Sequence, residues 1–80
     1  MRLFYFVGGP AEGETDAFRR RLADVGGSPP GWRIYPHAGG DNRALHVVEA
    51  ANQESILAHL AQFDRIYKRG PIVEIVQRPG

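Results

Sequence analysis

The chain predicts an α+β fold whose elements follow in the order strand, helix, strand, strand, helix, strand. Three observations indicate this order. Short runs of aromatic and β-branched residues are typical of strands, two other segments repeat apolar residues at helical spacing, and Gly- or Pro-rich turns separate most of them. At 80 residues the chain is expected to form a single domain, residues 1–80.

The first half of the chain supplies one strand and one helix. Residues 3–7 are aromatic and branched, and the Gly-Gly-Pro run at 8–10 is expected to end this strand. Capping and acidic residues at 14–16 precede a helix that the glycines at 26–27 end. The apolar stripe of this helix consists of Phe18, Leu22 and Val25.

The second half supplies three strands and another helix. Residues 32–38 and 43–50 read as two strands of a hairpin. Asn52 is a good N-cap for the second helix, which we expect to reach residue 69, before Gly70-Pro71. The stripe of this helix consists of Ile56, Leu60, Phe63 and Tyr67. Residues 72–77 form the expected last strand.

This order matches the ferredoxin-like arrangement, in which both helices cover one face of a four-stranded antiparallel sheet. Alternation sorts the strand residues between the two faces. The face expected beneath the helices holds Phe4, Phe6, Trp32, Ile34, Leu45, Val47, Val73 and Ile75. The face expected to be open holds Leu3, Tyr5, Val7, Arg33, Tyr35, His37, Ala44, His46, Val48, Ile72, Glu74 and Val76. This second set is too apolar for solvent and too polar for a core, so we expect a homodimer that buries it around a small-molecule pocket.

The hairpin supplies the candidate catalytic residues. If it is symmetric about Asp41-Asn42, His37 lies opposite His46 and Tyr35 opposite Val48, with Cβ atoms about 5 Å apart. Either histidine could then transfer a proton to a bound ligand. A one-residue bulge in the Gly39-Gly40 turn would instead place the two histidines on opposite faces.

Three further residues are candidates for substrate binding: Tyr5, Tyr35 and Glu74. The tyrosines could donate hydrogen bonds to a ligand or simply pack in the interface. Glu74 could act in the site, or could pair with Arg33 or with the partner chain. Together with the two histidines, Glu74 would also suit nickel, copper or zinc. His59 lies off the helical stripe and is expected to be solvated.

The amino-acid composition excludes several classes of binding partner. Charge is nearly balanced, with 10 Lys and Arg against 9 Asp and Glu, which argues against nucleic-acid binding. No apolar run approaches the roughly 20 residues that span a bilayer, and residues 1–7 are too short for a signal peptide, so we expect a cytoplasmic protein without a membrane partner. The absence of cysteine excludes disulfides, and so small a core favours a homo-oligomer. No phosphate-binding glycine motif occurs, and no cofactor is expected.

Five segments together resemble an uncharacterised family of small bacterial ferredoxin-like proteins in the dimeric α/β-barrel superfamily. They are Pro29-Pro30-Gly31-Trp32, Tyr35-Pro36-His37-Ala38-Gly39-Gly40, His46-Val47-Val48-Glu49-Ala50, Phe63-Asp64-Arg65-Ile66-Tyr67 and Ile72-Val73-Glu74-Ile75-Val76. Pro36 departs from the family, whose members usually have Trp before the His. The resemblance implies a dimer with an internal pocket, and the superfamily includes small monooxygenases, muconolactone-isomerase-like enzymes and a nickel-binding protein.

The function expected from these observations is that of a cofactor-independent isomerase, cyclase or monooxygenase acting on a small aromatic or polyketide-like compound. Two alternatives stay open. One is a protein that binds a metal such as nickel, or another small ligand, without turnover. The other is a purely structural dimerisation module, because a fold by itself does not select a reaction.

Overall fold

The computed structural model describes residues 1–37 and 42–76 of the chain. Its elements are β1 (Arg2–Pro10), α1 (Thr15–Asp24), β2 (Trp32–Pro36), β3 (Ala44–Ala50), α2 (Gln53–Leu60), the 3-10 helix η1 (Ala61–Phe63), β4 (Tyr67–Arg69) and β5 (Val73–Ile75). The expected α+β class is confirmed. None of the helices in these ranges combines the length and the apolar character needed to cross a membrane.

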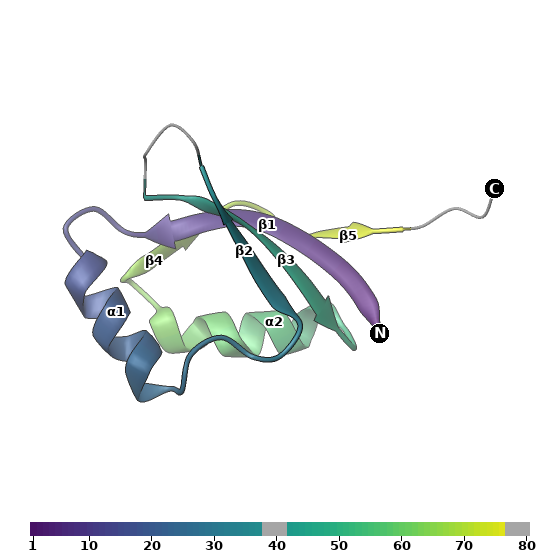
Figure 1. Ribbon diagram of the computed structural model, residues 1–80, viewed down its shortest axis with the longest axis horizontal. Coiled ribbons are helices and arrows are strands. Elements are labelled where there is room, and N and C mark those ends of the chain that lie inside the picture. The colour runs from purple at the N-terminus through teal and green to yellow at the C-terminus, as the bar shows by residue number, and fades with distance from the viewer. Residues whose placement is uncertain (38–41, 77–80) are drawn as a thin grey trace.

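Across the described ranges, the strands form one open antiparallel sheet in the order β2-β3-β1-β4, an order compatible with a ferredoxin-like topology. The fifth strand, β5, also pairs with β1. β4 lies along residues 8–10 of β1 and β5 along residues 3–5, so two short strands share one edge of a long one. Both helices lie on the same side of this sheet (Figure 1).

The core lies between α2 and the centre of the sheet. Its buried members are Phe4, Phe6, Val48, Ala50 and Ile56. Phe4 and Phe6 are on alternate positions of β1, so both point beneath the helices, and burying each ring contributes roughly 2–3 kcal/mol. The Asn52 side chain accepts a hydrogen bond from the Ser55 backbone N–H at 3.0 Å, which confirms the expected N-cap.

The hairpin between β2 and β3 is not symmetric about Asp41-Asn42. His46 lies opposite Ile34, and Val48 lies opposite Trp32, so the register differs by three residues from the expected one. An odd shift turns every side chain of a strand to the other face. The expected pairing of His37 with His46 is therefore wrong. The Gly39-Gly40 turn, where a bulge is considered above, lies outside the described residues, as does the expected end of the strand at Ala38.

The faces of β3 and β5 are the reverse of those expected. We call the side beneath the helices the covered face; besides the core residues of β1, it carries Trp32, Ile34, His46, Val48, Ala50 and Glu74. We call the other side the open face; it carries Leu3, Tyr5, Val7, Arg33, Tyr35, Leu45, Val47, Glu49, Val73 and Ile75. Alternation along the strands predicts that His46 and Glu74 lie on the open face. In the structure His46 lies on the covered face, where hydrogen bonds stabilise it, and Glu74 lies at an exposed end of the same face.

The second helix ends earlier than expected. α2 stops at Leu60, η1 adds one turn, and Arg65 then adopts a left-handed backbone with φ of 72°. Residues 67–69 form β4 instead of a last helical turn, because the extended part of β1 offers them a strand edge. For the same reason the Gly-Gly-Pro run continues β1 rather than ending it. The last strand is short, at residues 73–75, and residue 77 of its expected range lies outside the described residues.

Candidate functional site

His46 is the centre of a buried polar group on the covered face. Its ring stacks on Phe6, with centroids 4.6 Å apart and an interplanar angle of 5°. The Trp32 indole N–H donates to its Nδ1 at 2.9 Å, and its Nε2 lies 3.0 Å from the Tyr67 hydroxyl oxygen. We call these three linked side chains the Trp-His-Tyr chain. It joins β2, β3 and β4 beneath the helices.

The Trp32 contact determines which His46 nitrogen carries the proton. An indole N–H can only donate, so Nδ1 must accept and be unprotonated, and the neutral ring carries its hydrogen on Nε2. Burial lowers the pKa of His46, against the smaller opposing effect of the Gly8 backbone. The ring is therefore neutral at pH 7, with its Nε2–H donating to the Tyr67 oxygen.

Tyr67 is left with a hydroxyl proton of its own. Burial raises the pKa of Tyr67 well above its usual range, against the opposing effect of Arg69, so the side chain stays a neutral phenol. Its oxygen already accepts from His46, and its proton is free to be donated elsewhere. Gly8 makes room for this arrangement, since a Cβ atom there would lie 2.5 Å from the Tyr67 hydroxyl oxygen.

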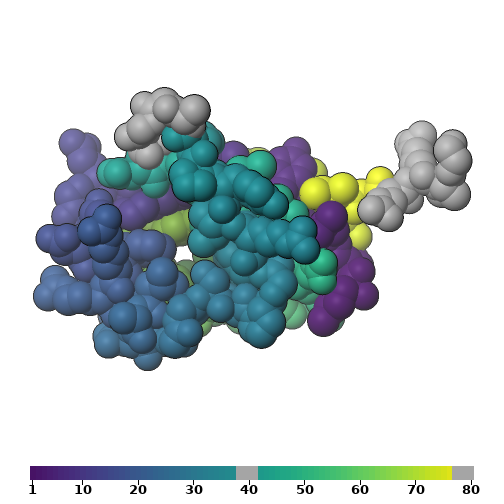
Figure 2. Space-filling model, in the orientation of Figure 1, coloured from purple at the N-terminus to yellow at the C-terminus, as the bar shows by residue number. Residues whose placement is uncertain are grey.

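The Trp-His-Tyr chain borders a cavity of about 140 Å³ between the sheet and the helices, which we call the inner cavity. The helical side contributes Phe18, His59 and Phe63. Figure 2 shows the surface hollowed between α1 and β2, where this space opens. None of the described residues that line it is Asp, Glu, Lys or Arg. The inner cavity is thus an aromatic space with a few neutral polar groups.

His59 also lines the inner cavity. The sequence predicts that its side chain is solvated, and the structure corrects this expectation. It is half-buried, and its ring centroid lies 4.9 Å from that of Trp32. The Gln62 side-chain nitrogen donates to the His59 carbonyl at 3.2 Å and lies 3.3 Å from its Nδ1, which therefore accepts and leaves the hydrogen on Nε2. Burial lowers the pKa of His59 as well. The sequence carried a signal, because Ile56, His59 and Phe63 follow at helical spacing.

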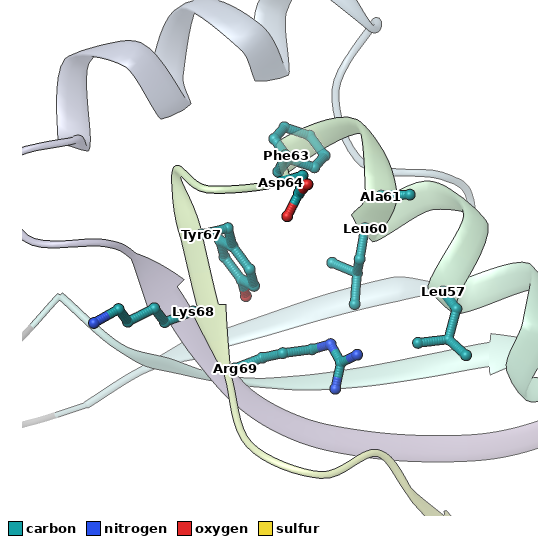
Figure 3. Close-up of a pocket in the computed structure, with 8 residues that line it drawn as sticks. All are labelled: Leu57, Leu60, Ala61, Phe63, Asp64, Tyr67, Lys68 and Arg69. Carbon is teal, nitrogen blue, oxygen red and sulfur yellow. The ribbon is translucent and has the colours of Figure 1, made fainter.

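A second, wider hollow lies against Tyr67, and we call it the outer groove (Figure 3). Its volume is about 660 Å³. It is lined by Leu57, Leu60, Ala61, Phe63, Asp64, Tyr67, Lys68 and Arg69. Leu60, Phe63 and Tyr67 line both spaces and stand between them. Asp64, Lys68 and Arg69 line the outer groove and not the inner cavity, so the linings of the two spaces differ in charge.

The structure separates most of the site residues expected from the sequence. Tyr5 and Tyr35 do share the open face, where they are 38% and 49% exposed. His46 lies on the covered face, and Glu74 forms an exposed ion pair with Arg2 at 2.6 Å. His37 lies just beyond β2. Their proposed catalytic and substrate-binding roles stay predictions, but His46 and Glu74 do not share the surface of the two tyrosines.

The described part of the chain contains no group of three or more His, Asp or Glu side chains placed to hold a metal ion. The structure does not bring together His37, His46 and Glu74, the three residues expected to suit nickel, copper or zinc. Trp32 and Tyr67 were missed as site residues because their spacing assigned one to the core and the other to a helix. Only the register that brings both to His46 reveals their role.

Comparison with known proteins finds no matching family model, no matching curated protein and no matching solved structure.

Proposed function

We propose that the chain binds a small neutral organic molecule in the inner cavity, with the Tyr67 hydroxyl donating a hydrogen bond to it. One observation carries this proposal: His46 holds the Tyr67 oxygen from one side, which leaves the phenol proton available at a cavity without charged lining residues. Apolar walls with a few oriented polar groups are the usual character of small-molecule sites.

The empty space itself supports binding over a purely structural role. The space opens to the surface between α1 and β2, and its lining of aromatic, aliphatic and neutral polar groups suits an apolar occupant better than bulk water. A hydrogen-bonded histidine needs no such space beside it. A ligand that fills the inner cavity would stabilise the folded chain by mass action.

Binding can be followed at the single tryptophan of the chain. We expect cyclohexanone, phenol and dissolved xenon to shift the Trp32 indole N–H resonance of the folded protein. The larger side chain of Ala44→Leu fills part of the inner cavity and should abolish the probe-induced shift of the indole resonance. The control Ala23→Leu, on the exposed side of α1, should leave that shift unchanged. An indole resonance that none of the three probes moves would overturn the proposal, as would full binding to the Ala44→Leu variant.

We propose in addition that the open face pairs with a second copy of the chain, in a ferredoxin-like dimer of the dimeric α/β-barrel kind. The support is a contiguous set of apolar side chains that no element covers in the described structure: Leu3, Tyr5, Val7, Leu45, Val47, Val73 and Ile75. Patches of this kind on small domains mark interfaces.

Sedimentation equilibrium tests the dimer with two matched variants. Val73 on the open face and Leu57 on α2 are both 38% exposed. We expect Val73→Lys to give monomers and Leu57→Lys to keep the mass of the wild type. A wild-type protein that stays monomeric at high concentration would remove this part of the proposal.

The enzymatic and metal-binding alternatives stay predictions. Both ring nitrogens of His46 are engaged in hydrogen bonds, so a proton transferred by His46 in an isomerase, cyclase or monooxygenase would have to pass through Tyr67. In this geometry His46 is a positioning residue for that hydroxyl group. Turnover of a small aromatic compound that is lost in Tyr67→Phe would favour the enzymatic role.

A further inference from the structure

We infer that the ligand of the inner cavity is a single six-membered ring that is uncharged and carries one hydrogen-bond acceptor, such as a ketone oxygen, for Tyr67. This inference rests on the proposed function and adds the chemical class of the ligand. Three properties of the cavity point to it independently: its volume, the aromatic pairs in its walls and the distribution of charge around it.

Volume sets the number of rings. The inner cavity measures about 140 Å³. A protein cavity of about 150 Å³ lined by apolar side chains holds one benzene molecule. A single ring with a short substituent therefore fills the space, and the opening between α1 and β2 can accommodate the substituent. Two fused rings exceed this volume, so the second ring would extend through the opening and gain fewer contacts with the walls.

The walls favour a flat ring. Trp32 and His59 meet at 4.9 Å with an interplanar angle of 60°, and Phe18 and Phe63 meet at 5.2 Å with an angle of 45°. All four line the cavity. Tilted pairs present both ring faces and ring edges, the two surfaces to which a further aromatic ring packs most favourably. A ring between them would gain contacts that a linear chain of equal volume cannot make.

The inner cavity disfavours a charged ligand, whereas the outer groove on the other side of Tyr67 has charged residues in its lining. Arg69 and Lys68 line the outer groove but not the inner cavity. A carboxylate in the inner cavity would lose its water without a cation to replace it, which is strongly unfavourable. A neutral acceptor has the Tyr67 hydroxyl as its partner, because the Tyr67 oxygen already accepts from His46 and only its proton is available.

Four probes of related shape test the inference through Kd values measured at the Trp32 indole resonance. Acetophenone has one ring and an acceptor, ethylbenzene lacks the acceptor, benzoate adds a charge, and 2-acetylnaphthalene adds a ring. We expect acetophenone to bind about fivefold to tenfold more tightly than ethylbenzene, the ratio for one net hydrogen bond. Benzoate and 2-acetylnaphthalene should bind at least tenfold more weakly than acetophenone.

The variant Tyr67→Phe should remove the advantage of acetophenone over ethylbenzene, whereas Tyr35→Phe on the open face should retain it. If Tyr67→Phe does not fold, the order of the four probes on the wild type still decides. Equal affinity for acetophenone and ethylbenzene overturns the acceptor, tight benzoate binding overturns neutrality, and tight naphthyl binding overturns the single ring. If none of the four probes binds, the proposed function fails together with the ligand class. If the probes bind in another order, only the ligand class fails, so the two outcomes can be told apart.

Discussion

Both faces of the sheet carry tyrosines, but those on the covered and open faces differ in burial and in hydrogen bonding. On the covered face, the Tyr67 oxygen is held by His46 and the His46 ring by Trp32. On the open face, Tyr5 and Tyr35 reach solvent and form no hydrogen bond with the described part of the chain. The difference teaches that burial, rather than residue type, gives a tyrosine a fixed hydrogen-bond partner here. A buried phenol must be oriented, and an exposed one is free to pack against a partner.

The largest contrast between the faces should come from removing an aromatic ring. Phe6→Ala deletes a fully buried ring that packs on His46 and should lower the free energy of unfolding by about 3–4 kcal/mol. Tyr5→Ala, one position away on the open face, should lower it by less than about 1 kcal/mol at concentrations where the chain is monomeric. Urea denaturation followed by circular dichroism measures both, and equal losses would mean that the covered face is not the core.

A smaller effect is expected from the space that Gly8 leaves for Tyr67. In Gly8→Ala the new methyl group would contact the Tyr67 hydroxyl, and relief of that overlap should cost about 1–3 kcal/mol. Gly70→Ala is a suitable control, because a Cβ atom there comes no nearer than 3.8 Å, to the Val7 carbonyl oxygen. Thermal unfolding should separate the two variants. If both unfold at the wild-type temperature, Tyr67 does not occupy the position described.

The Trp-His-Tyr chain can be broken at its donor. Trp32→Phe keeps an aromatic ring but leaves Nδ1 of His46 without a hydrogen bond, at a cost of about 1–3 kcal/mol. The same change should raise the pKa of His46, because no N–H then opposes a proton on Nδ1. Histidine C–H resonances followed against pH measure this. A His46 pKa that stays at its wild-type value would contradict the tautomer assigned here.

The smallest effect is a dependence of stability on pH. The pKa of His46 is lower in the folded chain than the roughly 6.5 of an exposed histidine, so between these two values the unfolded chain binds more protons. The stabilisation is present above about pH 6.5 and is lost as the pH falls toward the folded pKa. One such group gives a slope of at most about 1.4 kcal/mol per pH unit.

Urea titrations between pH 4 and 8 measure this slope. His46→Gln should reduce it, while the remainder includes His59, whose pKa is shifted in the same direction. A slope that is unchanged in His46→Gln would show that His46 titrates alike in the folded and unfolded chains.

The local elements were largely predictable, and their pairing was not. Alternating residues predicted a strand at the start of the chain and placed Phe4 and Phe6 beneath the helices, and Asn52 marked the start of α2. The aromatic residues Phe63 and Tyr67 fit helical spacing and strand propensity equally well. The edge of β1 decided between them, and an edge is a property of the folded sheet.

The sequence by itself determined the α+β class, the approximate positions of the first three strands and the start of α2 after Asn52, because these depend on the spacing of neighbouring residues. Only the tertiary structure decided the register of β3 and the strand at 67–69. A shift of three residues leaves the local pattern nearly unchanged, yet it moves His46 to the other side of the sheet. There it meets Trp32 and Tyr67, which lie far from it along the chain, and those contacts create the candidate site.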